Sequence, residues 1–201
     1  MVARDGDGYH TGVSSETDSR SAETAVAEAP ASEEQQAALR QIRTVGDPVL
    51  REAAERVGDF DGKLVELSER MLRIMHDAPG IGLAAPQIGV VRRVIVYDVG
   101  EPTTLVNPEI VSSSEERETI DEGCLSVPGV SVPIERPARV RVRGQDLQGA
   151  SREFEAAELE ARVIQHELDH LDGVLILERT SREERARALR EVRSGPVAGA
   201  L

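Results

Sequence analysis

The sequence has few aromatic residues, almost no cysteine and a deficit of positive charge. It contains no tryptophan, two tyrosines, two phenylalanines and one cysteine, and its 24 Lys and Arg residues against 37 Asp and Glu give a net charge of −13. One cysteine excludes an intramolecular disulfide. The acidic charge excludes the broad basic face that nucleic-acid binding needs, and the scarcity of aromatics excludes a stacking platform for bases. We therefore expect no direct DNA binding.

Long apolar segments are also missing. No run approaches the roughly 18 apolar residues that a transmembrane helix needs. The first seven residues lack the apolar core of a secretory signal. The sequence therefore predicts a cytoplasmic protein that does not contact a membrane.

Composition divides the chain into three parts. Residues 1–31 are rich in Ser, Thr, Ala and Gly, carry six acidic residues and two arginines, and show no apolar periodicity. Such a segment buries too little apolar surface to offset the entropy lost on ordering, so we predict a disordered acidic extension. The remainder predicts a single domain over 32–195, followed by a flexible tail over 196–201.

Apolar periodicity within the domain alternates between helical and strand spacing. Helices are predicted from Ser32, after Asp47, over 62–77, over 155–171 with Gly173 as the terminating residue, and from Ser181 to about Arg193. Strands are predicted over 90–99, 105–112, 130–134 and 139–143, with a turn at 146–149. This order predicts an α+β fold, in which antiparallel or mixed β-sheets pack around a central helix, with N-terminal helices and a C-terminal helix.

The central helix carries a pattern typical of metal sites. His166 and His170 are four residues apart, so both imidazoles lie on one face of the helix and can hold one metal ion. Leu159 and Val163 share that face, so we expect the histidines to point toward the core. Glu167 lies one residue further round, where it can reach a water on the metal without binding the ion itself.

A catalytic metal site needs a third protein ligand, and the residues alone leave its source open. Upstream, Cys124 lies between Gly123 and a Pro-Gly turn, a loop context suited to presenting a thiolate. Downstream, a zincin-like peptidase would use a carboxylate of the last helix, where the candidates are Glu183, Glu184 and Glu191. A third hypothesis is a non-catalytic metal protein, because two histidines and one cysteine can also hold electron-transfer copper.

Three segments together resemble a known family. Gly80-Ile-Gly-Leu-Ala-Ala-Pro-Gln87, Glu122-Gly-Cys-Leu-Ser126 and Gln165-His-Glu-Leu-Asp-His170 are similar to the three signature motifs of peptide deformylases, in the same order. Gly46-Asp-Pro-Val-Leu-Arg51 resembles the N-terminal segment of that family. The resemblance extends over about 42–179 and leaves the acidic extension outside.

The resemblance implies an enzyme that hydrolyses the N-formyl group of nascent peptides beginning with formylmethionine and releases formate. It implies Cys124, His166 and His170 as metal ligands, with water in the fourth position. Glu167 is then the general base and acid that moves the proton. The side-chain amide of Gln87 and the backbone N–H of Leu125 are the implied donors to the oxyanion.

The resemblance also implies residues that bind substrate. Gly82 would let the substrate backbone lie close to the loop. The apolar methionine pocket is expected to be lined by Ile81, Ile120, Val163 and His166. Gln165 and Asp169 are expected either to accept a hydrogen bond from the N–H of a metal-binding imidazole or to have a capping role.

Metal and partners follow from the same resemblance. The expected cofactor is one divalent ion, most often Fe²⁺, with Zn²⁺, Ni²⁺ or Co²⁺ able to replace it. The expected partners are N-formylmethionyl nascent peptides, with a ribosome contact through the arginine-rich C-terminal helix. One departure is visible: several family members carry a substrate-contacting arginine a few residues after the cysteine motif, whereas Val127–Ser131 contains none.

Overall fold

The computed structural model describes residues 32–194, which form an α+β fold. The strands are β1 (Gly82–Ala84), β2 (Val94–Asp98), β3 (Pro102–Ser113), β4 (Arg117–Cys124), β5 (Val127–Pro137), β6 (Arg139–Gln145) and β7 (Ser151–Ala157). The α-helices are α1 (Glu33–Leu39), α2 (Gly62–Asp77), α3 (Glu158–Leu171) and α4 (Arg182–Ser194), and the 3₁₀ helices are η1 (Pro48–Arg51), η2 (Ala85–Ile88) and η3 (Ile176–Glu178). The predicted fold class is confirmed. The predicted extension and tail lie outside the described residues, and the boundaries of the domain stay a prediction.

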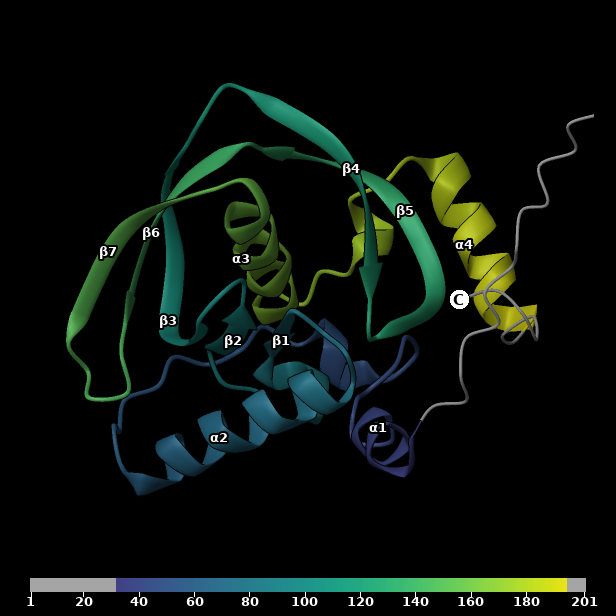
Figure 1. The fold of residues 1–201 in the computed structure, drawn as a ribbon. Helices are drawn as coiled ribbons and strands as arrows, with labels where there is room; N and C mark the ends of the chain where they lie inside the picture. Colours follow the sequence, from purple (N-terminus) through teal and green to yellow (C-terminus); the bar gives the residue numbers. More distant parts are fainter. Residues whose placement is uncertain (1–31, 195–201) are drawn as a thin grey trace, which may run out of the picture.

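Two antiparallel sheets surround α3. Five strands form one sheet in the order β1-β2-β3-β6-β7, and β4 and β5 form a separate two-stranded sheet. Figure 1 shows these strands arching around α3, which lies at the centre of the molecule, while α4 lies beside β5. The central position of α3 was predicted, and it brings the helix close to both sheets.

Apolar side chains fix α3 in this position. Ile164, Leu168 and Leu171 of the helix are buried together with Ile95 of β2 and Val142 of β6. A second cluster joins α2 to β1 and β2 and includes Met71 and Met75, each fully buried. The two methionines are therefore core residues, the usual role of a thioether side chain.

Backbone geometry marks both ends of α3. Glu158, its first residue, has a φ of +52°, and Gly173, just beyond its end, has a φ of +71°. A Cβ on Gly173 would lie 2.6 Å from the carbonyl oxygen of Arg51 in η1. Glycine is required there for both reasons, and the close approach places the end of α3 against η1.

Several predicted elements differ from the structure in extent. The helix predicted from residue 155 begins at Glu158, because β7 pairs with β6 as far as the Arg139–Ala157 pair. The strand predicted over 90–99 begins only at Val94, and the helix after Asp47 is a single 3₁₀ turn that ends at Arg51. β4 was not predicted at all. Most of its side chains are exposed, so they show no apolar alternation.

None of the helices within residues 32–194 is long and apolar enough to cross a membrane.

Candidate metal centre

Two separate elements bring three ligand-type side chains together. α3 carries His166 and His170, whose ring centroids are 5.2 Å apart. Cys124 is the last residue of β4, and its Sγ lies 3.2 Å from Nε2 of His170. Ligand atoms of all three residues lie within 4.8 Å of one another. The thiol was expected in a loop, whereas it stands at the end of a strand, immediately before the tight turn into β5.

The chemistry of this group fits a metal ion. One sulfur and two imidazole nitrogens form a three-ligand set that leaves a coordination position open. Burial alone would raise the pKa of the Cys124 thiol, but the charges and hydrogen bonds of His170 and His166 hold that pKa well below its usual range. The site therefore favours the thiolate, which is the form that binds metals.

A buried carboxylate orients one of the imidazoles. Oε2 of Glu122 lies 3.0 Å from Nδ1 of His166, which leaves Nε2 of that ring for a metal. Arg136 donates to both oxygens of Glu122, at 2.6 and 2.9 Å, and Arg162 donates to Oε1 at 2.7 Å. Although burial opposes it, hydrogen bonds from Arg136 and His166 lower the pKa of Glu122 to about 2.

This carboxylate corrects an expectation about the surroundings of the imidazoles. Asp169 instead accepts hydrogen bonds from Arg136 and Arg179. Gln165 donates to the carbonyl oxygens of Pro137 and Ala161. Because both side chains are occupied elsewhere in this way, Glu122 is the residue that holds His166. Glu122 belongs to the cysteine motif, but nothing in its spacing pointed to a histidine of another element.

The side-chain amide of Gln87 is held at both ends beside the thiol. Its Oε1 accepts a hydrogen bond from the Ala84 N–H at 2.8 Å, and its Nε2 donates to the Ser126 hydroxyl at 3.1 Å. Nε2 also lies 4.0 Å from Sγ of Cys124. Both Gln87 and Ser126 are buried. The amide is thus fixed next to the three ligand-type side chains, and Leu125 follows Cys124 directly in the chain.

Glu167 is buried without a full set of partners. Its side chain is 4% exposed, and within residues 32–194 its Oε2 has no hydrogen-bond partner. Burial raises the pKa of this carboxyl group to about 6. A Cβ on Gly82 would overlap Oε1 of Glu167 and lie 2.8 Å from Cγ1 of Val163. The carboxylate therefore occupies space that the glycine leaves free.

The apolar residues expected around the site differ in exposure. Val163 is only 5% exposed and lies against Gly82, whereas Ile81 and Ile120 are 49% and 48% exposed. Leu159 was expected to face the core with the histidines, but it is 52% exposed. The reason is that Leu159 lies in the first turn of α3, at the end where β7 gives way to the helix.

The downstream carboxylates are engaged elsewhere. Glu184 and Glu191 pair with Arg187 of their own helix at 2.8 and 3.0 Å, and Glu183 is exposed. Among the residues that the structure describes, the cluster able to hold a metal contains Cys124 instead. The geometry gives no support to a zincin-like third ligand. A copper site of the electron-transfer kind also finds no support, because two of the ligands share one helix.

Comparison with known proteins agrees with this geometry. The family model described as polypeptide deformylase matches residues 39–186. The peptide deformylase of Acidothermus cellulolyticus is 50% identical over 163 residues, covering 81% of this chain and 90% of the relative. That of Dictyoglomus thermophilum is 49% identical over 146 residues, covering 72% and 95%.

Solved structures of peptide deformylases match the fold as well. The crystal structure from Legionella pneumophila gives a TM-score of 0.73 at 40% identity, covering 76% of this chain and 92% of that chain. The structure from Thermotoga maritima gives a TM-score of 0.69 at 48% identity, covering 70% and 96%.

The fold and the ligand-type cluster define a metal-dependent enzyme with two histidines on one central helix. The chain belongs to the polypeptide deformylase family. The predicted family and enzyme class are confirmed, and the individual roles of the site residues stay predictions.

Proposed function

We propose that this chain removes the formyl group from N-formylmethionyl peptides. Water adds to the formyl carbon, the C–N bond breaks, and the products are formate and a peptide with a free amine. The observation that carries the proposal is the convergence of Cys124, His166 and His170 beside Glu167, a buried carboxyl group with a free oxygen.

We assign Cys124, His166 and His170 as ligands of one divalent cation. A sulfur and two imidazole nitrogens suit several first-row ions, and cellular supply selects among them. The family resemblance favours Fe²⁺, with Zn²⁺, Ni²⁺ and Co²⁺ as alternatives. When bound, such a cation supplies the Lewis acidity that activates water near neutral pH.

Glu167 carries the proton in this proposal. Its free Oε2 accepts the proton of the attacking water and later delivers it to the leaving amine. A carboxyl group with a pKa of about 6 can both take up and release a proton near neutral pH. The Glu167→Ala variant should therefore keep its metal but lose nearly all turnover.

Gln87 and Leu125 stabilise the oxyanion that forms on the formyl oxygen. The Nε2 group of Gln87 is already fixed beside Cys124, so it needs little reorganisation during the reaction. The backbone N–H of Leu125 is the second donor. Removing one such donor typically costs about 3–4 kcal/mol of transition-state stabilisation. The Gln87→Leu variant should lower kcat/KM and retain the metal.

The peptide binds along β1, the edge strand of the five-stranded sheet, to which Gly82 belongs. The substrate backbone pairs with the backbone of Gly82, on whose side-chain side the Glu167 carboxylate lies. Val163 forms the buried wall of the methionine pocket, and the half-exposed Ile81 and Ile120 form its rim.

We further propose a ribosome contact through α4 and a cytoplasmic location. Arg182, Arg190 and Arg193 form no ion pair within the described residues, whereas Arg185 and Arg187 are paired. The three unpaired guanidinium groups fit an anionic surface such as ribosomal RNA. Replacing all three with glutamate should abolish co-sedimentation with ribosomes, while hydrolysis of a free peptide stays unchanged.

Formate release from formyl-Met-Ala-Ser tests the activity directly. Protein purified without oxygen should release formate, and elemental analysis of the same sample identifies the metal. The Cys124→Ser variant should lose both metal and activity. Absence of formate release from metal-loaded wild-type protein would refute the proposed function.

A further inference from the structure

Arg162 connects the helix that carries the histidines to the strands that carry the cysteine. It lies on α3, one helical turn before His166, and its side chain is 10% exposed. Besides Glu122, it donates from Nη1 to the Ile134 carbonyl at 3.1 Å and from Nη2 to the Glu118 carbonyl at 2.8 Å. One guanidinium group therefore contacts β4, β5 and the carboxylate that orients His166.

The ligand-type side chains stand on two different parts of the fold. β4 and β5 form their own sheet, and the backbone hydrogen bonds from Ser114 to Arg139 and from Ala138 to Glu116 join it to the five-stranded sheet at the end of β4 opposite to Cys124. Cys124 moves with the small sheet, and the two histidines move with α3. Side chains that link the small sheet to the helix therefore contribute to the distance between the thiol and the imidazoles.

Arg162 and Arg136 divide this task. Arg136 belongs to β5 and holds Glu122 from the strand side, with a second contact to Asp169 on α3. Arg162 reaches from the helix and holds the strand backbone itself. Within residues 32–194, Arg162 is the side chain that bonds to the backbone of both strands, so losing it removes this link to α3 while Arg136 still holds Glu122 and Gln165 still bonds to the Pro137 carbonyl.

Burying an arginine is costly, so stability alone does not explain why one stands at this position. A buried guanidinium must be fully hydrogen-bonded, and an apolar residue of similar volume often stabilises a core as well or better. Arginine differs in that its planar group fixes several acceptors at once in a set geometry. We propose that Arg162 is a positioning residue that sets the separation between the Cys124 thiolate and the His166 and His170 imidazoles.

This inference rests on the ligand set proposed above, and metal binding tests both. Co²⁺ added to metal-free wild-type protein should give a thiolate charge-transfer band and d–d bands, and the Cys124→Ser variant should lose the charge-transfer band. In the Arg162→Leu variant, chelator competition should show metal affinity lower by about 10-fold to 100-fold, as for other groups that support metal ligands. Its d–d bands should shift even at saturating Co²⁺, because the sulfur sits at a changed distance.

Two further variants separate positioning from general stability. Arg162→Lys keeps the charge and one donor, so its affinity and spectrum should lie between those of wild type and Arg162→Leu. Arg141→Leu removes an exposed arginine of β6 whose ion pairs, within residues 32–194, are with Glu153 and Glu155, and it should behave as wild type in both measurements. Urea unfolding of each metal-free variant reports stability separately.

The outcomes are distinct. An unchanged spectrum and affinity in Arg162→Leu would refute the positioning role, as would a loss of stability with an unchanged spectrum at saturation. If Arg162→Leu does not fold, Arg162→Lys with a wild-type spectrum and affinity would refute it equally. If wild type and Cys124→Ser gave the same Co²⁺ spectrum, the proposed ligand set would fail and this inference with it.

Discussion

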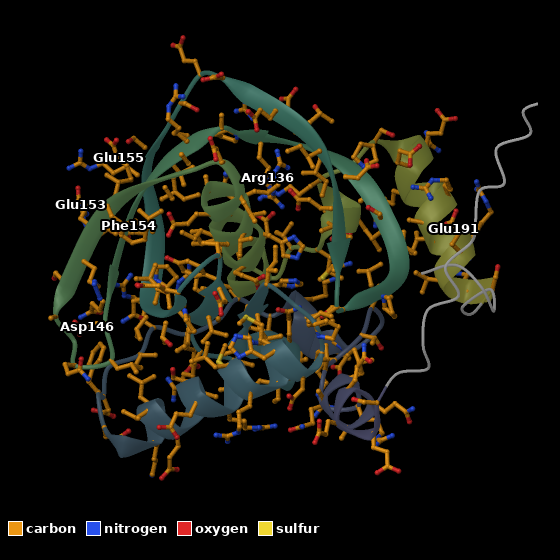
Figure 2. All side chains as sticks on the ribbon, in the orientation of Figure 1. Arg136, Asp146, Glu153, Phe154, Glu155 and Glu191 are labelled. Carbon is orange, nitrogen blue, oxygen red and sulfur yellow. The ribbon has the colours of Figure 1, made fainter. Side chains whose placement is uncertain are left out.

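Two networks of arginine and carboxylate groups in this molecule use the same chemistry in opposite surroundings. Next to the ligand-type side chains, Arg136 and Glu122 are 6% and 5% exposed and bond through two N–H groups. On the outer face of β6 and β7, Arg141 and Arg143 are each 50% exposed and pair with Glu153. Figure 2 shows Arg136 inside the molecule near α3, while Glu153 and Glu155 lie along its outer edge.

The comparison shows that ion pairs must be weighed by their surroundings. The exposed pairs on β6 and β7 are screened by water and salt, so each contributes little to stability. In the buried network every partner is needed, because an unpaired charge in the interior is expensive. The exposed ladder covers a sheet, whereas the buried network links the strand that carries Cys124 to the helix that carries His166.

The Glu122→Gln substitution should have the largest effect. It leaves Arg136 and Arg162 buried with one charge fewer, which should lower the free energy of unfolding by about 3–5 kcal/mol. Because His166 also loses its charged partner, metal affinity should fall by about 10-fold to 100-fold. Urea unfolding and chelator competition measure the two effects. An unfolding free energy within error of wild type would show that the Glu122 carboxylate does not stabilise the fold.

The Asp169→Asn substitution should have the next largest effect. It weakens charged hydrogen bonds from Arg136 and from the half-exposed Arg179, so we expect a loss of about 2–3 kcal/mol in unfolding free energy. The Glu122–His166 contact remains, so metal affinity should change much less than in Glu122→Gln. Equal losses of affinity in the two variants would contradict separate roles for the two carboxylates.

The hydrogen bond of Tyr97 should make a contribution of intermediate size to the free energy of unfolding, and this contribution should depend on pH. Its buried hydroxyl group donates to Glu160 at 3.0 Å, and burial, followed by the charge of Glu160, raises its pKa above the usual value of 10. The folded state thus holds this proton more tightly than the unfolded state, so its stabilisation is complete below pH 10 and is lost as pH rises above 10. The Tyr97→Phe variant should lose about 1 kcal/mol near neutral pH.

The alkaline limb is the sharper measurement for Tyr97. Between pH 9 and 11, the unfolding free energy of wild type should fall more steeply than that of Tyr97→Phe. Parallel curves for the two proteins would indicate that Tyr97 ionises equally in the folded and unfolded states.

The Glu153→Gln substitution should have the smallest effect. It removes a carboxylate that pairs with both Arg141 and Arg143 on the exposed face. We expect an unfolding midpoint indistinguishable from that of wild type at 0.15 M salt, because solvent already screens these pairs. A clear drop in the midpoint would mean that the exposed ladder behaves as a cooperative network.

The sequence predicted the elements that have strong local signals. The helix over 62–77 agrees with α2 at both ends, because Asp61 caps it and its apolar residues recur at helical spacing. The spacing of His166 and His170 predicted their shared face. The pairing of Cys124 with them could be reached only through the resemblance, because no local pattern joins residues more than 40 positions apart.

The features that were not predicted depend on contacts between residues far apart in the sequence. β4 has mostly exposed side chains, so no alternation marks it as a strand, yet β5 pairs with it along nearly its whole length. Arg162 follows the charged first turn of α3, where an arginine is ordinarily solvated, and only the arrival of β4 and β5 buries it. Leu159 shows the opposite outcome: it was expected to be buried, but it lies in the first turn of α3 and is 52% exposed.

Beside the ligand-type cluster, Gly82 and Glu167 pack so closely that the side chain of one occupies the space that a side chain of the other would need. The space that any side chain at position 82 would require is filled by the carboxylate of Glu167. Even a methyl group at position 82 would therefore force the Glu167 carboxylate into another rotamer. A glycine in one motif and a glutamate in another thus form a single packing unit, although 85 positions separate them.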